Sequence, residues 1–157
     1  DRAPLGIDYQ VGSAYELPFR AATFDVVVTN HLASDLADLD QAAREIARVL
    51  RPNGRWISLQ LHPVYGVRQD DPDWVLGYHA LRAREHWFIV SGHRAPEPVV
   101  RHDRSLTDLL GAPTKAGLLL ASVTEPHPTE EQMRDPWWKA NWDRPVVLLF
   151  EAVKPWC

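Results

Sequence analysis

The chain has 157 residues, of which 45% are hydrophobic and 24% charged, and a formal net charge of −4. These values are typical of one globular domain with a sizeable core, so we expect a single domain over residues 1–157. No basic run favours nucleic acid, and no apolar stretch approaches the roughly 18 residues of a membrane span. We therefore expect a cytoplasmic protein that binds neither nucleic acid nor a membrane. The 14 arginines against 3 lysines favour a bacterial source.

Two β-strands are predicted near the start of the chain. Residues 7–11 form a short β-prone run, and a loop containing Leu17, Pro18 and Phe19 follows. Residues 24–29 are apolar and largely β-branched apart from Asp25. Such a run is typical of a central strand that is buried on both faces of a parallel sheet.

A helix and a further strand follow. Apolar residues recur at helical spacing, and Asp38 and Gln41 are placed as an N-cap and its partner. Pro52 and Gly54 are expected to end this helix before a strand over residues 55–61. The alternation of strand, helix and strand predicts the α/β class. The apolar residues of the helix are Leu39, Ala43, Ile46, Ala47 and Leu50.

Residues 62–103 break this alternation. The segment is rich in proline, aspartate, histidine and aromatic residues, with one β-like run at 86–91. It is too long for an ordinary connection between two elements, and such insertions are commonly lids or binding loops. We therefore expect an inserted lid here.

The remainder of the chain predicts one helix and two strands. Ser105 and Asp108 are spaced as a capping box, so a helix should begin there. Proline inside a helix costs about 3 kcal/mol, so Pro113 predicts a break or a kink near Gly111. Apolar runs at 118–124 and 146–153 predict two closing strands, joined by a segment that contains Trp137, Trp138 and Trp142.

Two phrases of the sequence match a known pattern. GSAYELPFRAATFDVVVTNHL at residues 12–32 and LADLDQAAREIARVLRPNGRWISLQLHP at residues 36–63 resemble the centre of the class I S-adenosylmethionine (SAM) dependent methyltransferases of the type 11 group. That family reads approximately GDAxxLPF, then FDxV, and later RVL(R/K)PGG, with Asn53 here in place of the first glycine of the pair. HDRSLTDLL, EPHPTEE and RPVVLLFEAVKP are similar to later family segments.

The resemblance implies an incomplete Rossmann-like sheet and SAM as the cofactor. It places Ser13 where the family usually has an aspartate that accepts the adenine amino group, and the Ala14 amide beside the adenine ring. A serine hydroxyl can still accept this hydrogen bond, but without charge. Asn30 and His31 would lie beneath the methionine end of the cofactor.

The candidate catalytic residues are His31 and His62, at the ends of predicted strands. An imidazole titrates near neutral pH and could act as a general base. The alternative for His31 is a histidine that only caps the end of its strand or lines the pocket. The alternative for His62 is an ordinary turn out of the sheet. The lid suggests four substrate-binding residues, although its aromatic members could instead form a small core: Tyr65, Tyr78, Trp87 and Arg104.

No metal site is expected. The histidines of the second half of the chain form neither HxH nor HExxH, and no set of carboxylates accompanies them. They are His62, His79, His86, His93 and His102.

The glycines depart from the family pattern. No two of them form even a GxG, so the glycine-rich loop that holds SAM in these enzymes is not found in this sequence. We expect the C-terminal part of a methyltransferase that methylates a small molecule, either within a longer enzyme or completed by a homodimer or partner chain. The alternative is a short relative that has lost SAM and acts in ligand binding, scaffolding or a non-methylating reaction.

Overall fold

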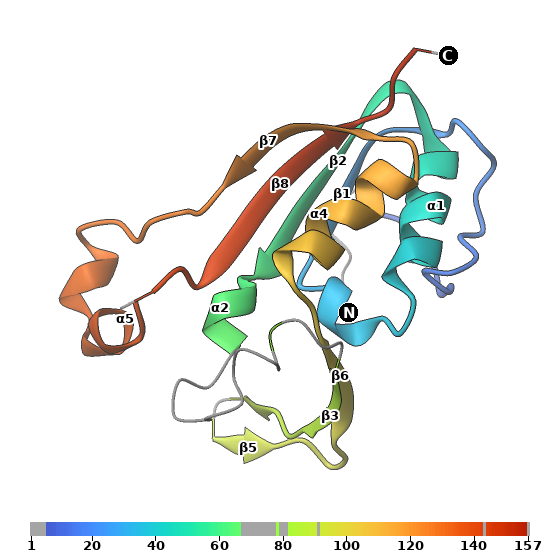
Figure 1. Cartoon of the computed structure of the whole chain (residues 1–157). Helices are drawn as coiled ribbons and strands as arrows, with labels where there is room; N and C mark the ends of the chain where they lie inside the picture. Colours follow the sequence, from blue (N-terminus) through green and yellow to red (C-terminus); the bar gives the residue numbers. More distant parts are fainter. Residues whose placement is uncertain (1–5, 67–77, 79–81, 91, 143, 157) are drawn as a thin grey trace.

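A four-stranded mixed sheet organises the fold, shown in a computed structural model that describes residues 6–66, 78, 82–90, 92–142 and 144–156. The strands lie in the order β1-β2-β8-β7 (Figure 1). β1 and β2 are parallel, whereas β8 is antiparallel to both β2 and β7. The predicted α/β class is confirmed. The strand bounds are Phe24–Asn30 for β1, Leu50–Leu61 for β2, Leu119–Thr124 for β7 and Val147–Val153 for β8.

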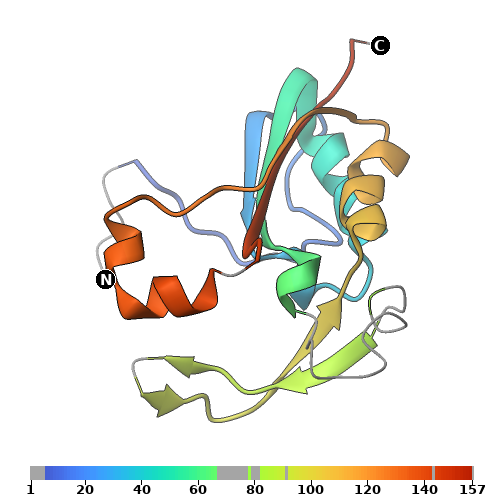
Figure 2. The same ribbon diagram turned by 60° about the vertical axis from the view of Figure 1, so that its left-hand side comes forward.

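Two helices, α1 (Leu39–Val49) and α4 (Leu106–Lys115), cover the same face of this sheet (Figure 2). Burial therefore alternates along the two central strands, as it should when one face of a sheet packs on a core. Trp56 of β2 and Phe150 of β8 meet edge to face beneath the helices, with ring centroids 5.2 Å apart. The other buried members of these strands are Leu50, Gly54, Ser58, Gln60, Leu148 and Ala152.

Both predicted helix starts are confirmed. The Asp38 carboxylate accepts the Gln41 amide at 2.9 Å, and Ser105 and Asp108 form a reciprocal capping box. The predicted break near Gly111 is wrong, because α4 continues through Pro113 to Lys115, whereas the alternative of a kink stays a prediction. Pro113 lies in the last turn and is fully buried in the core. The free energy gained by burying its ring offsets part of the cost of the backbone hydrogen bond that proline cannot donate.

The first strand differs from its prediction. β1 pairs only with β2 among the described residues, and Val26 and Val28 are 47% and 68% exposed. The strand is therefore not buried on both faces. Residues 7–11 form no strand, and Val11 is fully exposed. A β-prone run needs a partner strand to satisfy its backbone groups, and this run has none among the described residues.

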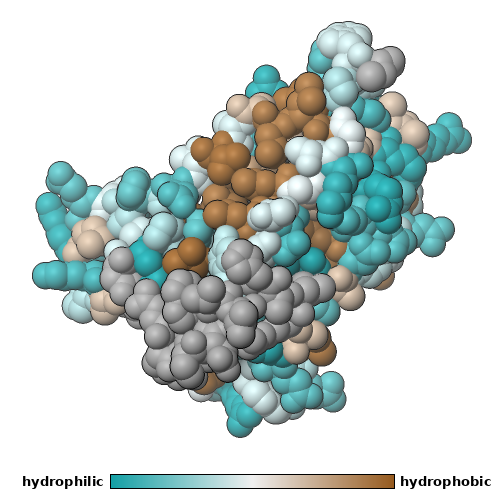
Figure 3. Space-filling model, in the orientation of Figure 1, coloured by the Kyte–Doolittle hydropathy of each residue, from teal (hydrophilic) through white to brown (hydrophobic). Residues whose placement is uncertain are grey.

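Hydrophobic side chains are also exposed at the opposite edge of the sheet. Figure 3 shows hydrophobic surface over the part of the molecule where β7 and β8 lie. Leu119 and Val123 of β7 are 62% and 47% exposed. Both ends of the described sheet therefore retain uncovered apolar area.

Residues 62–103 form small elements near the carboxyl end of β2. They comprise α2 (Pro63–Gly66), β3 (Arg82–His86) paired with β6 (Val99–Asp103), and β4 (Ile89–Val90) paired with β5 (His93–Arg94). Figure 1 shows them below the sheet. Residues 67–77, 79–81 and 91 of the predicted lid lie outside the described residues, and the lid and single-domain predictions stay predictions. The short elements elsewhere are η1 (Ala33–Asp35), η2 (Gln132–Arg134) and α5 (Pro136–Asn141). Within the described part of the chain, no helix is long and apolar enough to cross a membrane.

The backbone at the start of β2 explains the departure from the family's glycine pair. Asn53 has φ 62°, a left-handed conformation that glycine adopts freely and asparagine tolerates. Gly54 is different, because a Cβ at this position would lie 2.8 Å from the Arg51 carbonyl oxygen and 3.1 Å from that of Phe24. Only the second glycine of the pair is therefore required by space.

We predict that Gly54→Ala lowers the free energy of unfolding by about 1–3 kcal/mol, the usual cost of overpacking. Chemical denaturation monitored by circular dichroism would measure it. Gly111→Ala is the matched control, since its new Cβ would meet only the Lys115 side chain at 3.9 Å. That change should stabilise α4 by about 0.5–1 kcal/mol. Equal stability of the two variants would contradict the account of this segment.

Candidate functional site

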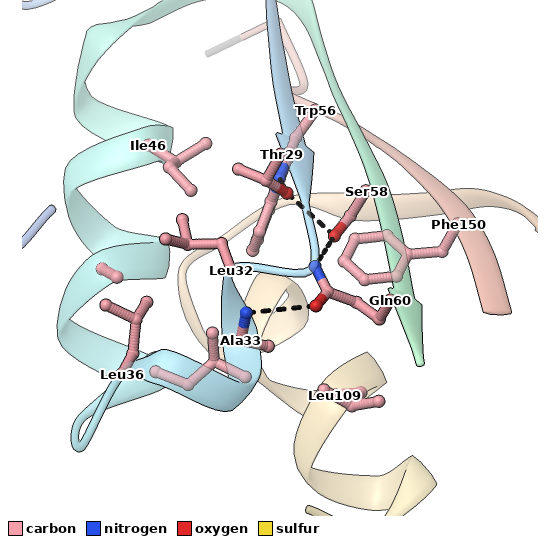
Figure 4. A pocket seen from close by; sticks show the side chains of 12 residues that line it. Thr29, Leu32, Ala33, Leu36, Ile46, Trp56, Ser58, Gln60, Leu109 and Phe150 are labelled. Carbon is pink, nitrogen blue, oxygen red and sulfur yellow. Dashed lines mark hydrogen bonds between the residues drawn. The ribbon is translucent and has the colours of Figure 1, made fainter. Parts of the chain in front are cut away.

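A chain of buried hydrogen bonds fixes the carboxyl ends of β1 and β2 (Figure 4). The Trp56 indole donates to Thr29 Oγ1 at 2.9 Å, and Thr29 donates to Ser58 Oγ at 2.9 Å. Gln60 donates to the same Ser58 oxygen at 2.7 Å and accepts the Ala33 amide at 3.1 Å. These groups line a small cavity beneath α1, about large enough for one water molecule. The network joins both strands to η1, the segment that follows β1.

His31 occupies the point where the chain leaves β1. Its amide donates to the Leu59 carbonyl at 2.8 Å, and its φ is 54°. Left-handed backbone at a non-glycine residue costs free energy, and such residues cluster at functional sites. The Nε2 atom of His31 is buried and has no hydrogen-bond partner among the described residues. His31 is therefore an unsatisfied polar group at the carboxyl edge of the sheet, whereas its neighbour Asn30 is exposed.

The loop that contains Ser13 and Ala14 is attached to the start of α1. The Tyr15 hydroxyl accepts the amides of Ala37 at 2.7 Å and Asp38 at 3.2 Å, and Ala14 packs against the core. Ser13 Oγ accepts the Tyr15 amide at 3.1 Å and remains exposed, so its hydroxyl hydrogen is available to a further group. The structure thus brings this loop close to the segment after β1.

An ion pair on α1 fixes the following part of the loop. Arg48 donates to the carbonyls of Phe19 at 2.7 Å and Leu17 at 2.9 Å, and to Glu45 at 2.8 Å. Glu45 in turn accepts the Leu17 amide at 2.8 Å. The hydrogen bond from Arg48 holds the pKa of the Glu45 carboxyl below its ordinary value of 4.5. The Leu-Pro-Phe phrase is therefore anchored by charge-assisted hydrogen bonds.

His62 lies at the carboxyl end of β2 and is 3% exposed. Its Nδ1 accepts the Val64 amide at 3.1 Å, and its Nε2 lies 2.9 Å from Oε1 of Glu125. The oxygen lies off the N–H direction, so Nε2 has no aligned hydrogen-bond partner among the described residues. Glu125 directly follows β7 and was missed by the sequence analysis, because no local pattern connects it with His62.

The four predicted substrate residues contact different parts of the described structure. Arg104 donates to the carbonyls of Ala33, Leu36 and Ala37, and burial lowers the pKa of its guanidinium. Its contacts hold the segment after β1 in place. The Tyr78 hydroxyl accepts the first amide of α4, and the Tyr65 amide donates to the His62 carbonyl. Trp87 is 39% exposed and stacks with Arg94 at 3.6 Å.

Two further positioning residues escaped the sequence analysis. Tyr15 and Gln60 act through backbone amides of the segment after β1, and only the fold brings those amides near. No three histidine, cysteine, aspartate or glutamate side chains come together as metal ligands in the described part of the chain.

Comparison with known proteins places this geometry in a class. Residues 1–58 match the family model described as a methyltransferase domain. The ubiquinone/menaquinone biosynthesis C-methyltransferase UbiE of Desulfotalea psychrophila is 40% identical over 61 residues, which are 39% of this chain and 25% of that protein. The match thus spans a quarter of the relative's length.

Two solved structures resemble nearly the whole chain. A SAM-dependent methyltransferase from Mesorhizobium loti has a TM-score of 0.71 at 23% identity, over 98% of this chain and 72% of that one. A putative SAM-dependent methyltransferase from Listeria monocytogenes has a TM-score of 0.75 at 20% identity, with the same coverage of both chains.

The described fold is therefore that of the SAM-dependent methyltransferases. Residues 1–58 match the methyltransferase-domain family model, which confirms the resemblance to the type 11 group. The cofactor implied by this family and fold is SAM.

We predict that Glu45→Gln lowers the free energy of unfolding by about 1 kcal/mol at pH 7, the cost typical of a weakened hydrogen bond. A carboxyl whose folded-state pKa is lowered stabilises the fold above its unfolded-state pKa and loses this contribution as the pH falls through the lower value. The gap between wild type and variant should therefore narrow on acidification below about pH 4.5. Thermal melts from pH 7 to pH 3 would measure the gap, and a constant gap would contradict this role.

Proposed function

We propose that this chain forms the later part of a SAM-dependent methyltransferase that methylates a small molecule. One observation carries the proposal. The segment that matches the family builds the carboxyl edge of β1 and the loop beside it, and there the buried Nε2 of His31 has no hydrogen-bond partner among the described residues. Open α/β sheets bind their ligands at this edge. A strained residue with an unsatisfied polar atom is what a ligand site requires.

The residues at this edge fit the cofactor. Ser13 and Ala14 would receive the adenine, and Asn30 and His31 would lie beside the methionine end. The Ser13 hydroxyl has a free hydrogen and a spare lone pair, and the loop is attached to α1 through Tyr15. SAM supplies an electrophilic methyl group on a sulfonium when bound. The protein's part is to hold the acceptor in line with that methyl group and to exclude water.

The exposed edge of β1 supports completion by further strands. The backbone groups of β1 on the side away from β2 pair with no strand of the described structure, and together with the exposed Val26 and Val28 they form an edge that natural proteins usually cover. A longer chain, a second copy or a partner chain would supply the covering strands and the loop for the amino-acid part of SAM. A longer chain agrees with the length of the UbiE relative, because the match spans only 25% of that protein.

The proposed acceptor is a small molecule that enters from the side of α2 and the β3–β6 ladder. The UbiE relative bears the name of a quinone-biosynthesis C-methyltransferase, which makes a small aromatic acceptor the first to test. A carbon, oxygen or nitrogen nucleophile is compatible with the site. Tyr65, Tyr78, Trp87 and Arg104 remain the proposed lining, with Arg104 acting through the backbone that it holds.

We predict that Ser13→Asp strengthens binding of S-adenosylhomocysteine by about tenfold, because a charged acceptor forms stronger hydrogen bonds than a hydroxyl. Isothermal titration of the full-length protein, with its mass verified, would measure this affinity. Asp8→Ser serves as a control at an acidic position outside the proposed cofactor contacts.

Absence of binding to both the wild type and Ser13→Asp would contradict the proposal. That result would favour the alternative, a relative that uses this fold for ligand binding or a non-methylating reaction. A gain in affinity for S-adenosylhomocysteine in Ser13→Asp but not in Asp8→Ser would assign adenine binding to the loop at Ser13, independently of any catalytic assay.

A further inference from the structure

His62 and Glu125 form a pair that the proposed function leaves unused. His62 is buried, and the Val64 amide donates to its Nδ1 at 3.1 Å. A neutral imidazole has one donor and one acceptor nitrogen, so the proton of neutral His62 lies on Nε2. Oε1 of Glu125 lies 2.9 Å from Nε2, off the N–H direction. Nδ1 is therefore occupied by a protein group, and Glu125 is within reach of Nε2 without an aligned hydrogen bond.

The topology brings Glu125 to the ligand edge. β2 and β7 are each antiparallel to β8, so they run parallel to one another with β8 between them. Glu125 follows the last residue of β7, just as His62 follows the last residue of β2. Both therefore lie at the same carboxyl edge as Asn30 and His31, and the Glu125 side chain is 51% exposed.

Among the described residues, Glu125 is paired with a histidine rather than with a lysine or arginine. In the described part of the chain, no lysine or arginine forms an ion pair with it. Other acidic side chains do have such partners, namely Asp25, Asp40, Glu45, Asp103 and Glu151. The exposed Glu125 carboxylate can therefore accept hydrogen bonds from the solvent side. The unsatisfied buried atom of the pair is Nε2 of His62.

We propose that Glu125 faces the bound small molecule and accepts a hydrogen bond from its hydroxyl or amino group, and that His62 positions this carboxylate. The inference rests on the proposed function, since the ligand is the methyl acceptor. As that acceptor reacts, its O–H or N–H bond breaks, the electron pair stays on the oxygen or nitrogen, and the proton passes to Glu125. A small rotation of the exposed Glu125 side chain aligns it with Nε2–H, as hydrogen bonds at active sites often tighten when a ligand binds.

This assignment changes the role expected for His62. The sequence predicts His62 as a candidate catalytic residue, whereas the proposal makes it a donor that orients a carboxylate. His62 is the buried group that orients the pair, and the exposed Glu125 carboxylate is the hydrogen-bond acceptor. Glu125 is then the residue that touches the ligand, and His62 acts through it.

The test uses phenol and anisole as probes, which differ in the O–H hydrogen that Glu125 would accept. Their affinities for the full-length protein would be measured by protein-observed NMR from the shifts of the Val64 and Glu125 amides. The wild type should bind phenol more tightly than anisole. Glu125→Gln should weaken the affinity for phenol by about tenfold and leave the affinity for anisole unchanged, because a hydrogen bond to a charged group is lost. Glu130→Gln, an exposed acid in the following loop, should change neither.

His62 is tested by its tautomer and by a conservative variant. Long-range ¹H–¹⁵N spectra should show the proton of neutral His62 on Nε2, and His62→Gln, which keeps an N–H donor, should retain the preference for phenol. His62→Leu should lose that preference while thermal melts verify its fold.

A proton on Nδ1, equal affinity of the wild type for phenol and anisole, or unchanged phenol binding in Glu125→Gln would overturn the proposal. Titration of S-adenosylhomocysteine into the same samples separates this result from the proposed function. A wild type that prefers phenol over anisole but does not bind S-adenosylhomocysteine would contradict methyl transfer. A wild type that binds S-adenosylhomocysteine but does not distinguish phenol from anisole would contradict the role of Glu125.

Discussion

The buried hydrogen bonds between β1 and β2 are the constraint on which the candidate site depends. Thr29, Ser58 and Gln60 are polar side chains in a largely apolar core, and each is satisfied by another member of the network. Because an unpaired buried polar group costs about 1–3 kcal/mol, the network favours one register of the two strands. Through the Ala33 amide it also fixes η1, and hence the exit of the chain at His31.

The surrounding contacts hold the same corner from outside the core. Arg104, at the end of the predicted lid, donates to three carbonyls in the segment after β1, and Tyr15 accepts two amides just beyond it. The loop carrying Ser13 and Ala14, the end of β1 and the β3–β6 ladder are therefore linked through backbone groups of one short segment. A ligand bound at this corner would meet a preorganised surface, which limits the entropy lost on binding.

Much of the fold follows from local sequence, whereas the site follows from it only in part. The caps at Asp38 and Ser105 were predictable because capping joins residues three positions apart. The exposure of Val26 was not, since it depends on what lies beside the strand rather than on the strand itself. Burial of Pro113 likewise depends on tertiary packing. His31 could be located from the strand end alone, but its contact partners, like the pairing of His62 with Glu125, become visible only when distant strands share an edge.

The most direct test of the account is a crystal structure of the full-length protein with S-adenosylhomocysteine. The account predicts the ligand at the carboxyl edge of β1, with its adenine at Ser13 and Ala14, its sulfur end beside His31, and further strands paired with β1. Ligand bound at another edge of the sheet, or a β1 edge left unpaired in a protein that binds the cofactor, would contradict it.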